Sequence, residues 1–170
     1  MIVAETDRLI LSKITTDDAA FILELMNTPD WIKYIGDRNI KTVEEAANYI
    51  QNNQLKCYKE HGFGYYKVQV KAEKLKSIGT FGLLKRDTLE YIDIGFSMLP
   101  EYHRKGYGFE AASEIVHLAK NSFNIKMLCA ITLPENKPSI RLLEKLGLSY
   151  QKTVKPFEDD KELLFFVKKL

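Results

Sequence analysis

The chain has 170 residues, of which 45% are hydrophobic and 28% charged, and its 25 basic and 23 acidic side chains leave a formal net charge of +2. This length fits one domain, residues 1–170, with an ordinary packed core. The balanced charge gives no reason to expect a nucleic-acid or membrane partner, and no apolar run approaches the ~20 residues of a membrane span.

The first half of the chain predicts one strand and then helices. Residues 8–14 (RLILSKI) alternate in part between apolar and polar side chains, which predicts a strand. Capping residues and apolar residues at helical spacing then predict helices over residues 16–27 and 42–62. The segment between them reads as a loop or a broken helix, and Gly62 ends the second helix.

From residue 63 the hydrophobic period becomes that of strands. Three predicted strands, at 63–70, 77–84 and 90–99, are joined by short links, which imply antiparallel neighbours. The link that contains Lys85 and Arg86 reads as a solvated turn or strand end. The elements that follow are a helix over 106–121, a buried strand over 126–133 parallel to the strand before that helix, a helix from Pro138 to Gly147, and strands at 149–154 and 163–170.

This order predicts an α+β fold, a mixed and mostly antiparallel sheet of about seven strands flanked by helices. A doubly wound sheet does not fit, because a single βαβ unit occurs, late in the chain. The sheet leaves two assemblies open, a monomer and a homodimer formed through an edge strand in the final LLFFVKKL.

The segment EYHRKGYGFEAA (101–112) contains G-x-G-x-x-A, a pattern found in dinucleotide-binding proteins. That function requires a strand directly before the glycines and an acidic residue about 20 residues later. Here the preceding strand ends at Pro100, six positions before Gly106, and the apolar LCAITL lies where the acid should be. The dinucleotide interpretation is therefore rejected.

The same segment predicts a pyrophosphate site formed by the loop itself. Glycine lets the backbone approach a ligand closely, and the first N–H groups of a helix lack partners and carry partial positive charge. Two cations precede the glycines and add full charges. The predicted site comprises Arg104, Lys105, Gly106, Tyr107, Gly108 and Phe109.

Together with NKPSIRLLEKLGL (136–148), this loop resembles the acyl-CoA-binding motifs of the GNAT superfamily of N-acetyltransferases. The loop is similar to the family's (Q/R)-x-x-G-x-(G/A) segment, and the later stretch to its N-x-x-(S/A)-x-x-L-(Y/L)-E-K-x-G-(F/L) helix. ETDRLILSKITTDDA and WIKYIGDRNIKTVEEA further resemble the ribosomal-protein (RimJ/RimL-type) branch. The resemblance covers essentially the whole chain and implies the GNAT fold and direct acetyl transfer from acetyl-CoA to an amine.

Two residues depart from the family pattern. His103 stands where Gln or Arg is usual, which weakens side-chain help to the phosphates. Leu143 stands where many members have a Tyr that protonates the departing thiolate, so a Tyr general acid at that position is excluded.

The resemblance and the strand alternation together suggest catalytic roles. Asp93 lies off the apolar face of its strand and matches a position that is often Glu, so it is the candidate base, directly or through a water; the alternative is a simple ion pair. Glu90 is a weaker candidate. Backbone N–H groups of Ser97, Met98 and Leu99 would stabilise the developing oxyanion.

The second motif contributes two further candidates. Asn136 would hydrogen-bond the pantetheine arm or a substrate water, and Ser139 would contact the sulfur or relay a proton. The alternative for each is an ordinary helix-capping role.

The acceptor is predicted from acid–base chemistry. At pH 7 an α-amine (pKa ~7.8) is neutral far more often than a lysine-type amine (~10.4), and a site with one carboxylate and no Tyr acid suits the easier amine. A protein N-terminus is therefore favoured. Two alternatives stay open, namely a small-molecule (polyamine or antibiotic) acetyltransferase and a non-catalytic acyl-CoA-binding module. Trp31, Tyr34 and Phe157 either wall the acceptor cleft or belong to the core.

Cysteine and histidine positions suggest no metal site. Cys57 and Cys129 have no CxxC spacing and no neighbouring His, so we expect free thiols and, with no signal peptide at the start, a cytoplasmic protein. His61, His103 and His117 lack metal-ligand spacing.

Overall fold

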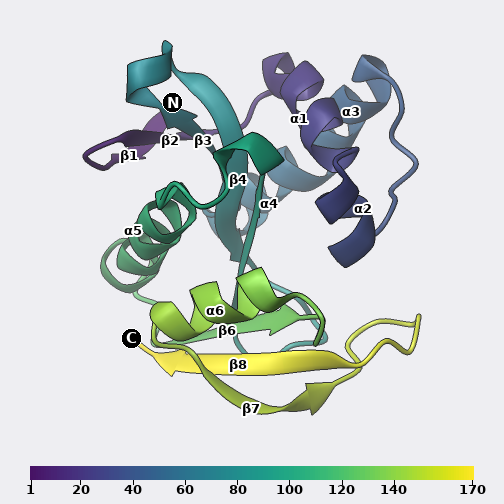
Figure 1. Cartoon of the computed structure of the whole chain (residues 1–170), viewed down its shortest axis with the longest axis vertical. Helices are drawn as coiled ribbons and strands as arrows, with labels where there is room; N and C mark the ends of the chain where they lie inside the picture. The colour runs from purple at the N-terminus through teal and green to yellow at the C-terminus, as the bar shows by residue number, and fades with distance from the viewer.

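The computed structural model describes residues 1–170 and contains one eight-stranded sheet with helices on both sides (Figure 1). Its strands follow the order β1-β2-β3-β4-β5-β6-β8-β7, and all neighbours are antiparallel except β5 and β6. The strands are β1 (Ile2–Glu5), β2 (Leu9–Lys13), β3 (Tyr65–Val70), β4 (Lys76–Leu84), β5 (Ile92–Met98), β6 (Met127–Thr132), β7 (Ser149–Val154) and β8 (Leu163–Lys169). The predicted fold class is confirmed, with one more strand than expected.

The additional strand is β1, which pairs along the edge with β2. Its four residues are too few to show a two-residue period, and its register with β2 shifts between Ile2 and Ala4. At the other end of the sheet β8 lies between β6 and β7, so β7 is the edge strand. The expectation of an edge strand in LLFFVKKL was wrong, because the chain turns back and places its last strand inside the sheet.

The helices are α1 (Ala19–Met26), α2 (Pro29–Tyr34), α3 (Val43–Ile50), α4 (Lys56–His61), α5 (Tyr107–Asn121) and α6 (Lys137–Lys145). A π-helical turn, Gln51–Leu55, joins α3 to α4, so the predicted helix over 42–62 is one helical segment with a wide turn inside it. Gly62 ends it with φ +77°, a conformation that favours glycine. Thr28 and Pro29 start α2 in the segment predicted as a loop or broken helix.

Helices cover the two faces of the sheet differently (Figure 1). Helix α5 packs on one face, where Phe81 stacks on Phe96 with ring centroids 5.7 Å apart, and α1 to α4 lie on the other side. A separate apolar cluster joins α1 to α3 through Ile22, Ala46 and Ile50. None of the helices combines the length and the apolar composition that a membrane span requires.

The parallel pair β5–β6 creates the opening on which the site depends. Its ladder contains Ile92↔Leu128 and Asp93↔Cys129 and then stops, although β5 continues to Met98. Beyond Asp93, β6 pairs with β8 and no longer with β5. The two strands therefore diverge and leave one edge of β5 without a strand partner.

Candidate active site

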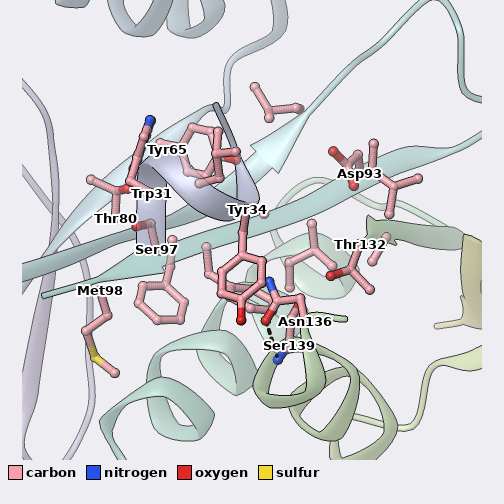
Figure 2. Close-up of a pocket in the computed structure, with 18 of the residues that line it drawn as sticks. Trp31, Tyr34, Tyr65, Thr80, Asp93, Ser97, Met98, Thr132, Asn136 and Ser139 are labelled. Carbon is pink, nitrogen blue, oxygen red and sulfur yellow. Dashed lines mark hydrogen bonds between the residues drawn. The ribbon is translucent and has the colours of Figure 1, made fainter. Parts of the chain in front are cut away.

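A cavity of about 1180 Å³ occupies this opening, and some of its lining residues are drawn in Figure 2. Its lining includes residues that project to opposite faces of β5, such as Phe96 and Ser97. Residues of α2, β4, β5, β6, the start of α5 and the start of α6 line it. Most of the predicted site residues are among them: Trp31, Tyr34, Asp93, Ser97, Met98, Arg104, Gly106, Gly108, Phe109, Asn136, Ser139 and Phe157. Leu99, Lys105 and Tyr107 lie outside the lining.

The loop before α5 has the geometry of an anion site. Arg104 and Gly106 have φ values of +60° and +80°, and the left-handed Gly106 precedes the first helical residue. The backbone N–H groups of residues 104–109 donate to no group within the chain, and the first internal bond of this helix runs from Glu110 N to Gly106 O. Successive free N–H groups at the start of a long helix fit a diphosphate.

Arg8 holds this loop from outside the cavity. Its Nε and Nη2 each lie 2.6 Å from Glu110 Oε2, and its Nη1 donates to the Lys105 carbonyl at 3.0 Å. Its guanidinium also lies 4.6 Å from the ring centroid of Tyr107. The Lys105 carbonyl and the Tyr107 ring therefore face Arg8, and the Lys105 ammonium lies 5.0 Å from the Tyr102 ring centroid, so neither side chain lines the cavity.

The end of β5 differs from the predicted row of donors. Leu99 is buried and its N–H donates to Ile78 O at 2.8 Å, so that N–H is not available to a ligand. His103, the atypical loop residue, lies 3.0 Å from the Met98 carbonyl through Nε2 and 3.9 Å from Asp30 through Nδ1. Ser97 and Met98 remain on the cavity wall.

Asp93 is almost completely buried, with 2% of the residue exposed. Its Oδ2 accepts a hydrogen bond from Arg86 Nε at 2.8 Å, and its Oδ1 has no partner. Burial raises the pKa of Asp93 to about 6, against the opposing effect of the Arg86 guanidinium. Both interpretations of Asp93 thus find support: it is ion-paired, and it keeps a free oxygen and a pKa near neutrality.

The other base candidate, Glu90, lines a separate smaller pocket with Tyr91 and Met127. Arg86 corrects the expectation of a solvated turn, because it is half-buried and holds Asp93. The turn after β4 is short enough to bring Arg86 back beside Asp93, which pairs with Leu84 at the end of the β4–β5 ladder.

Two candidates lie at the start of α6. The Asn136 side chain accepts a hydrogen bond from Ser139 N at 3.3 Å and so caps the helix, the dashed contact in Figure 2. Its amide NH₂ donates to no group within the chain. Ser139 is buried on the cavity wall, and Leu143 lies one turn further along.

The three predicted aromatic residues all line the cavity. Trp31 and Tyr34 come from α2, and Phe157 comes from the link between β7 and β8, where it lies 5.5 Å from the Arg86 guanidinium. Trp31 also packs against both apolar clusters, so it belongs to the core and to the wall at once.

Sequence reasoning assigned no role to Gln54, in the π-helical turn, or to Tyr65, on β3, and both line this cavity. The signal for Tyr65 was indirect: Gly82 and Gly95 sit inside predicted strands, where glycine marks a close approach by another group.

Comparisons with known proteins agree with this geometry. The family model of the acetyltransferase (GNAT) domain matches residues 8–149. The chain is 27% identical over 157 residues to the uncharacterized N-acetyltransferase YoaA of Bacillus subtilis (strain 168), covering 91% of this chain and 87% of that protein.

Solved structures share the fold at low sequence identity. A putative ribosomal-protein-serine acetyltransferase from Vibrio cholerae has a TM-score of 0.80 at 21% identity, over 100% of this chain and 98% of that chain. RimL, a ribosomal L7/L12 α-N-protein acetyltransferase solved with coenzyme A, has a TM-score of 0.80 at 11% identity, with coverages of 100% and 98%. Because the family model spans most of the sequence, the chain belongs to the GNAT acetyltransferase family and is an acetyl-CoA-dependent N-acetyltransferase.

Proposed function

We propose that this enzyme transfers the acetyl group of acetyl-CoA to the α-amine of a protein N-terminus. The observation that carries the proposal is the single cavity that joins the free N–H groups of residues 104–109 to Asp93 through the β5–β6 opening. A cofactor held at one end would present its acyl group near the carboxylate. The two free cysteines suit a cytoplasmic enzyme.

Residues at different positions along the cavity have different roles in this proposal. Acetyl-CoA supplies an activated acetyl thioester when it is bound. The loop at 104–109 holds the pyrophosphate, with Arg104 adding charge, and the Asn136 amide binds the pantetheine arm. Met98 offers its backbone N–H along the unpaired edge of β5, whereas the N–H of Ser97, like that of Leu99, is directed to β4. Ser139 lies where the sulfur would be.

Asp93 accepts the proton that the attacking amine loses. The carboxylate is covered, so the proton reaches Oδ1 through a water molecule rather than by direct contact with the amine. Arg86 occupies Oδ2 and fixes the orientation of the carboxylate. A base with a pKa near 6 is ionised at neutral pH and is still basic enough to take the proton.

Two considerations support an α-amine acceptor. The neutral fraction of an α-amine at pH 7 is far larger than that of a lysine amine. The Vibrio cholerae protein and RimL, which share this fold, are named as acetyltransferases of ribosomal proteins, and this agrees with a protein acceptor.

An acceptor panel tests the proposal. We expect faster CoA release with a peptide that has a free α-amine than with the same peptide blocked at its N-terminus but carrying a lysine. Spermidine and an aminoglycoside should be turned over more slowly still. Mass spectrometry should place the acetyl group on the terminal nitrogen. Faster turnover of either small amine would overturn the choice of acceptor, and CoA binding without release for every amine would indicate a non-catalytic module.

Replacement of Arg8 by lysine should weaken acetyl-CoA binding without slowing the chemical step. Lysine cannot hold Glu110 with two nitrogens and bind the Lys105 carbonyl with a third, so the phosphate loop loses its brace. The loss of one charge-assisted hydrogen bond corresponds to about a 10-fold rise in KM for acetyl-CoA, with kcat unchanged. Steady-state kinetics of Arg8→Lys, compared with the surface variant Arg141→Lys as a control, measure KM for acetyl-CoA and kcat. An unchanged KM would leave Arg8 with a role in folding alone.

A further inference from the structure

Tyr65, Gly82 and Gly95 form a row across three neighbouring strands. Tyr65 on β3 pairs with Gly82 on β4, and Gly82 pairs with Gly95 on β5. Directly paired residues in antiparallel strands project to the same face of a sheet. A Cβ atom added to Gly95 would overlap the hydroxyl oxygen of Tyr65. The tyrosine side chain therefore crosses the sheet over two glycines, and its hydroxyl ends directly above β5.

This position lies beside the reacting groups. Asp93 and Ser97 are two residues before and after Gly95, so they share its face of β5. The β5–β6 ladder stops at Asp93, which puts the hydroxyl at the point where the opening begins. Tyr65, Asp93 and Ser97 line the same cavity, as Figure 2 shows.

The backbone of Tyr65 is anchored, while its hydroxyl has no hydrogen-bond partner within the chain. The Tyr65 carbonyl accepts a hydrogen bond from Tyr58 Oη, which also accepts one from Ile14 N and so ties the start of β3 to the end of β2. The Tyr65 hydroxyl itself makes no hydrogen bond within the chain. Burial raises the pKa of Tyr65, more than the nearby Arg86 lowers it, so the group stays protonated and acts as a donor rather than a base.

We propose that Tyr65 is a catalytic residue whose hydroxyl donates a hydrogen bond to the carbonyl oxygen of the acetyl thioester. The proposal rests on the proposed acetyl transfer. The acyl carbon must lie between the sulfur, held at α6, and the amine, which arrives on the Asp93 side. The Tyr65 hydroxyl lies above Gly95, two residues along β5 from Asp93, and Tyr65 lines the same cavity as Asp93 and Ser139.

Acetyl transfer requires no proton from Tyr65. The amine nitrogen forms a bond to the acyl carbon, the carbon–sulfur bond breaks, and the electron pair leaves on the CoA thiolate. The amine proton passes through water to Asp93 and then to solvent. Tyr65 keeps its proton and stabilises the negative charge that develops on oxygen, as an oxyanion-hole donor does.

Tyr65→Phe removes the donor while leaving the ring over the glycines. We expect kcat to fall about 10²-fold, with KM for acetyl-CoA and the calorimetric Kd for CoA nearly unchanged. The limb of the pH profile that belongs to Asp93 should stay in place. Tyr66→Phe is the matched control, because Tyr66 is the next residue, points to the opposite face and lies outside the cavity lining.

A spectroscopic measurement separates this role from a structural one. In the binary complex with ¹³C-carbonyl acetyl-CoA, the thioester C=O stretch should lie at lower frequency in wild type than in Tyr65→Phe. Equal frequencies, or an unchanged kcat, would overturn the proposal. So would a rise in KM or in the Kd for CoA that accounts for the whole defect. A wild type that acetylates no amine would instead overturn the proposed function, and the carbonyl frequency would still report on Tyr65.

Discussion

Asp93→Asn should lower kcat/KM by about 10²–10⁴-fold, the usual contribution of a general base. The same replacement should leave the fold as stable as wild type or more stable at pH 8. The pKa of Asp93 is raised from 3.8 to about 6, which means that the folded protein disfavours the ionised carboxylate even with Arg86 beside it. Asparagine keeps an oxygen for Arg86 Nε and carries no charge to bury.

The sign of the pH dependence follows from the same shift. Between pH 3.8 and about 6 the folded state holds a proton that the unfolded chain has released, so stability from this group falls as the pH rises through that window. The full difference is at most about 3 kcal/mol and persists above pH 6. In wild type kcat/KM should rise with an apparent pKa near 6, and the Asn variant should lose that limb.

Thermal unfolding at pH 5 and pH 8, together with pH–rate profiles, measures both halves of this prediction. Asp87→Asn is the matched control, since Asp87 is an exposed carboxylate next to Arg86 in the link before β5 and also lines the cavity. If Asp93→Asn unfolds more easily at pH 8 and retains activity, Asp93 serves only as an ion-pair partner of Arg86.

The fold could be predicted because its signals are local. Short links fixed the antiparallel order of β3, β4 and β5, and the helix between β5 and β6 fixed their parallel pairing. The short strand β1 escaped prediction because four residues show too little alternation. The interior place of β8 escaped it because strand order depends on contacts between distant parts of the chain.

The site was predictable to a different degree at its two ends. The phosphate loop is encoded by residues close together in sequence, and its free N–H groups lie where the glycines and the helix start predict them. The acceptor side is assembled from residues that are distant in sequence. Local patterns therefore indicated only a solvated turn for Arg86 and an ordinary strand for Tyr65. Leu99 shows a third limit, since strand alternation does not say which N–H groups already have partners.

Gly108→Ala tests the phosphate loop, because we expect this variant to fold as stably as wild type and yet to bind CoA more weakly. A Cβ at this position would lie 3.6 Å from Met98 Cε and 3.9 Å from Leu142 Cδ2, which is ordinary contact. Alanine is a better helix former than glycine by up to about 1 kcal/mol, so the variant should unfold at the same or a higher temperature. Nothing in the chain itself requires glycine here.

A pyrophosphate bound against the backbone of the loop would require glycine at position 108. The added methyl would hold the pyrophosphate away from the N–H groups at the start of α5, and one or two charge-assisted hydrogen bonds at about 1.5–3 kcal/mol each would be lost. We expect the Kd for CoA, measured by calorimetry, to rise about 10²-fold. Gly106→Ala is the contrasting control: its φ of +80° makes alanine strained, so that variant should lose stability as well. A Gly108→Ala protein that binds CoA as tightly as wild type would place the pyrophosphate elsewhere, because a phosphate seated on these N–H groups leaves no room for the methyl.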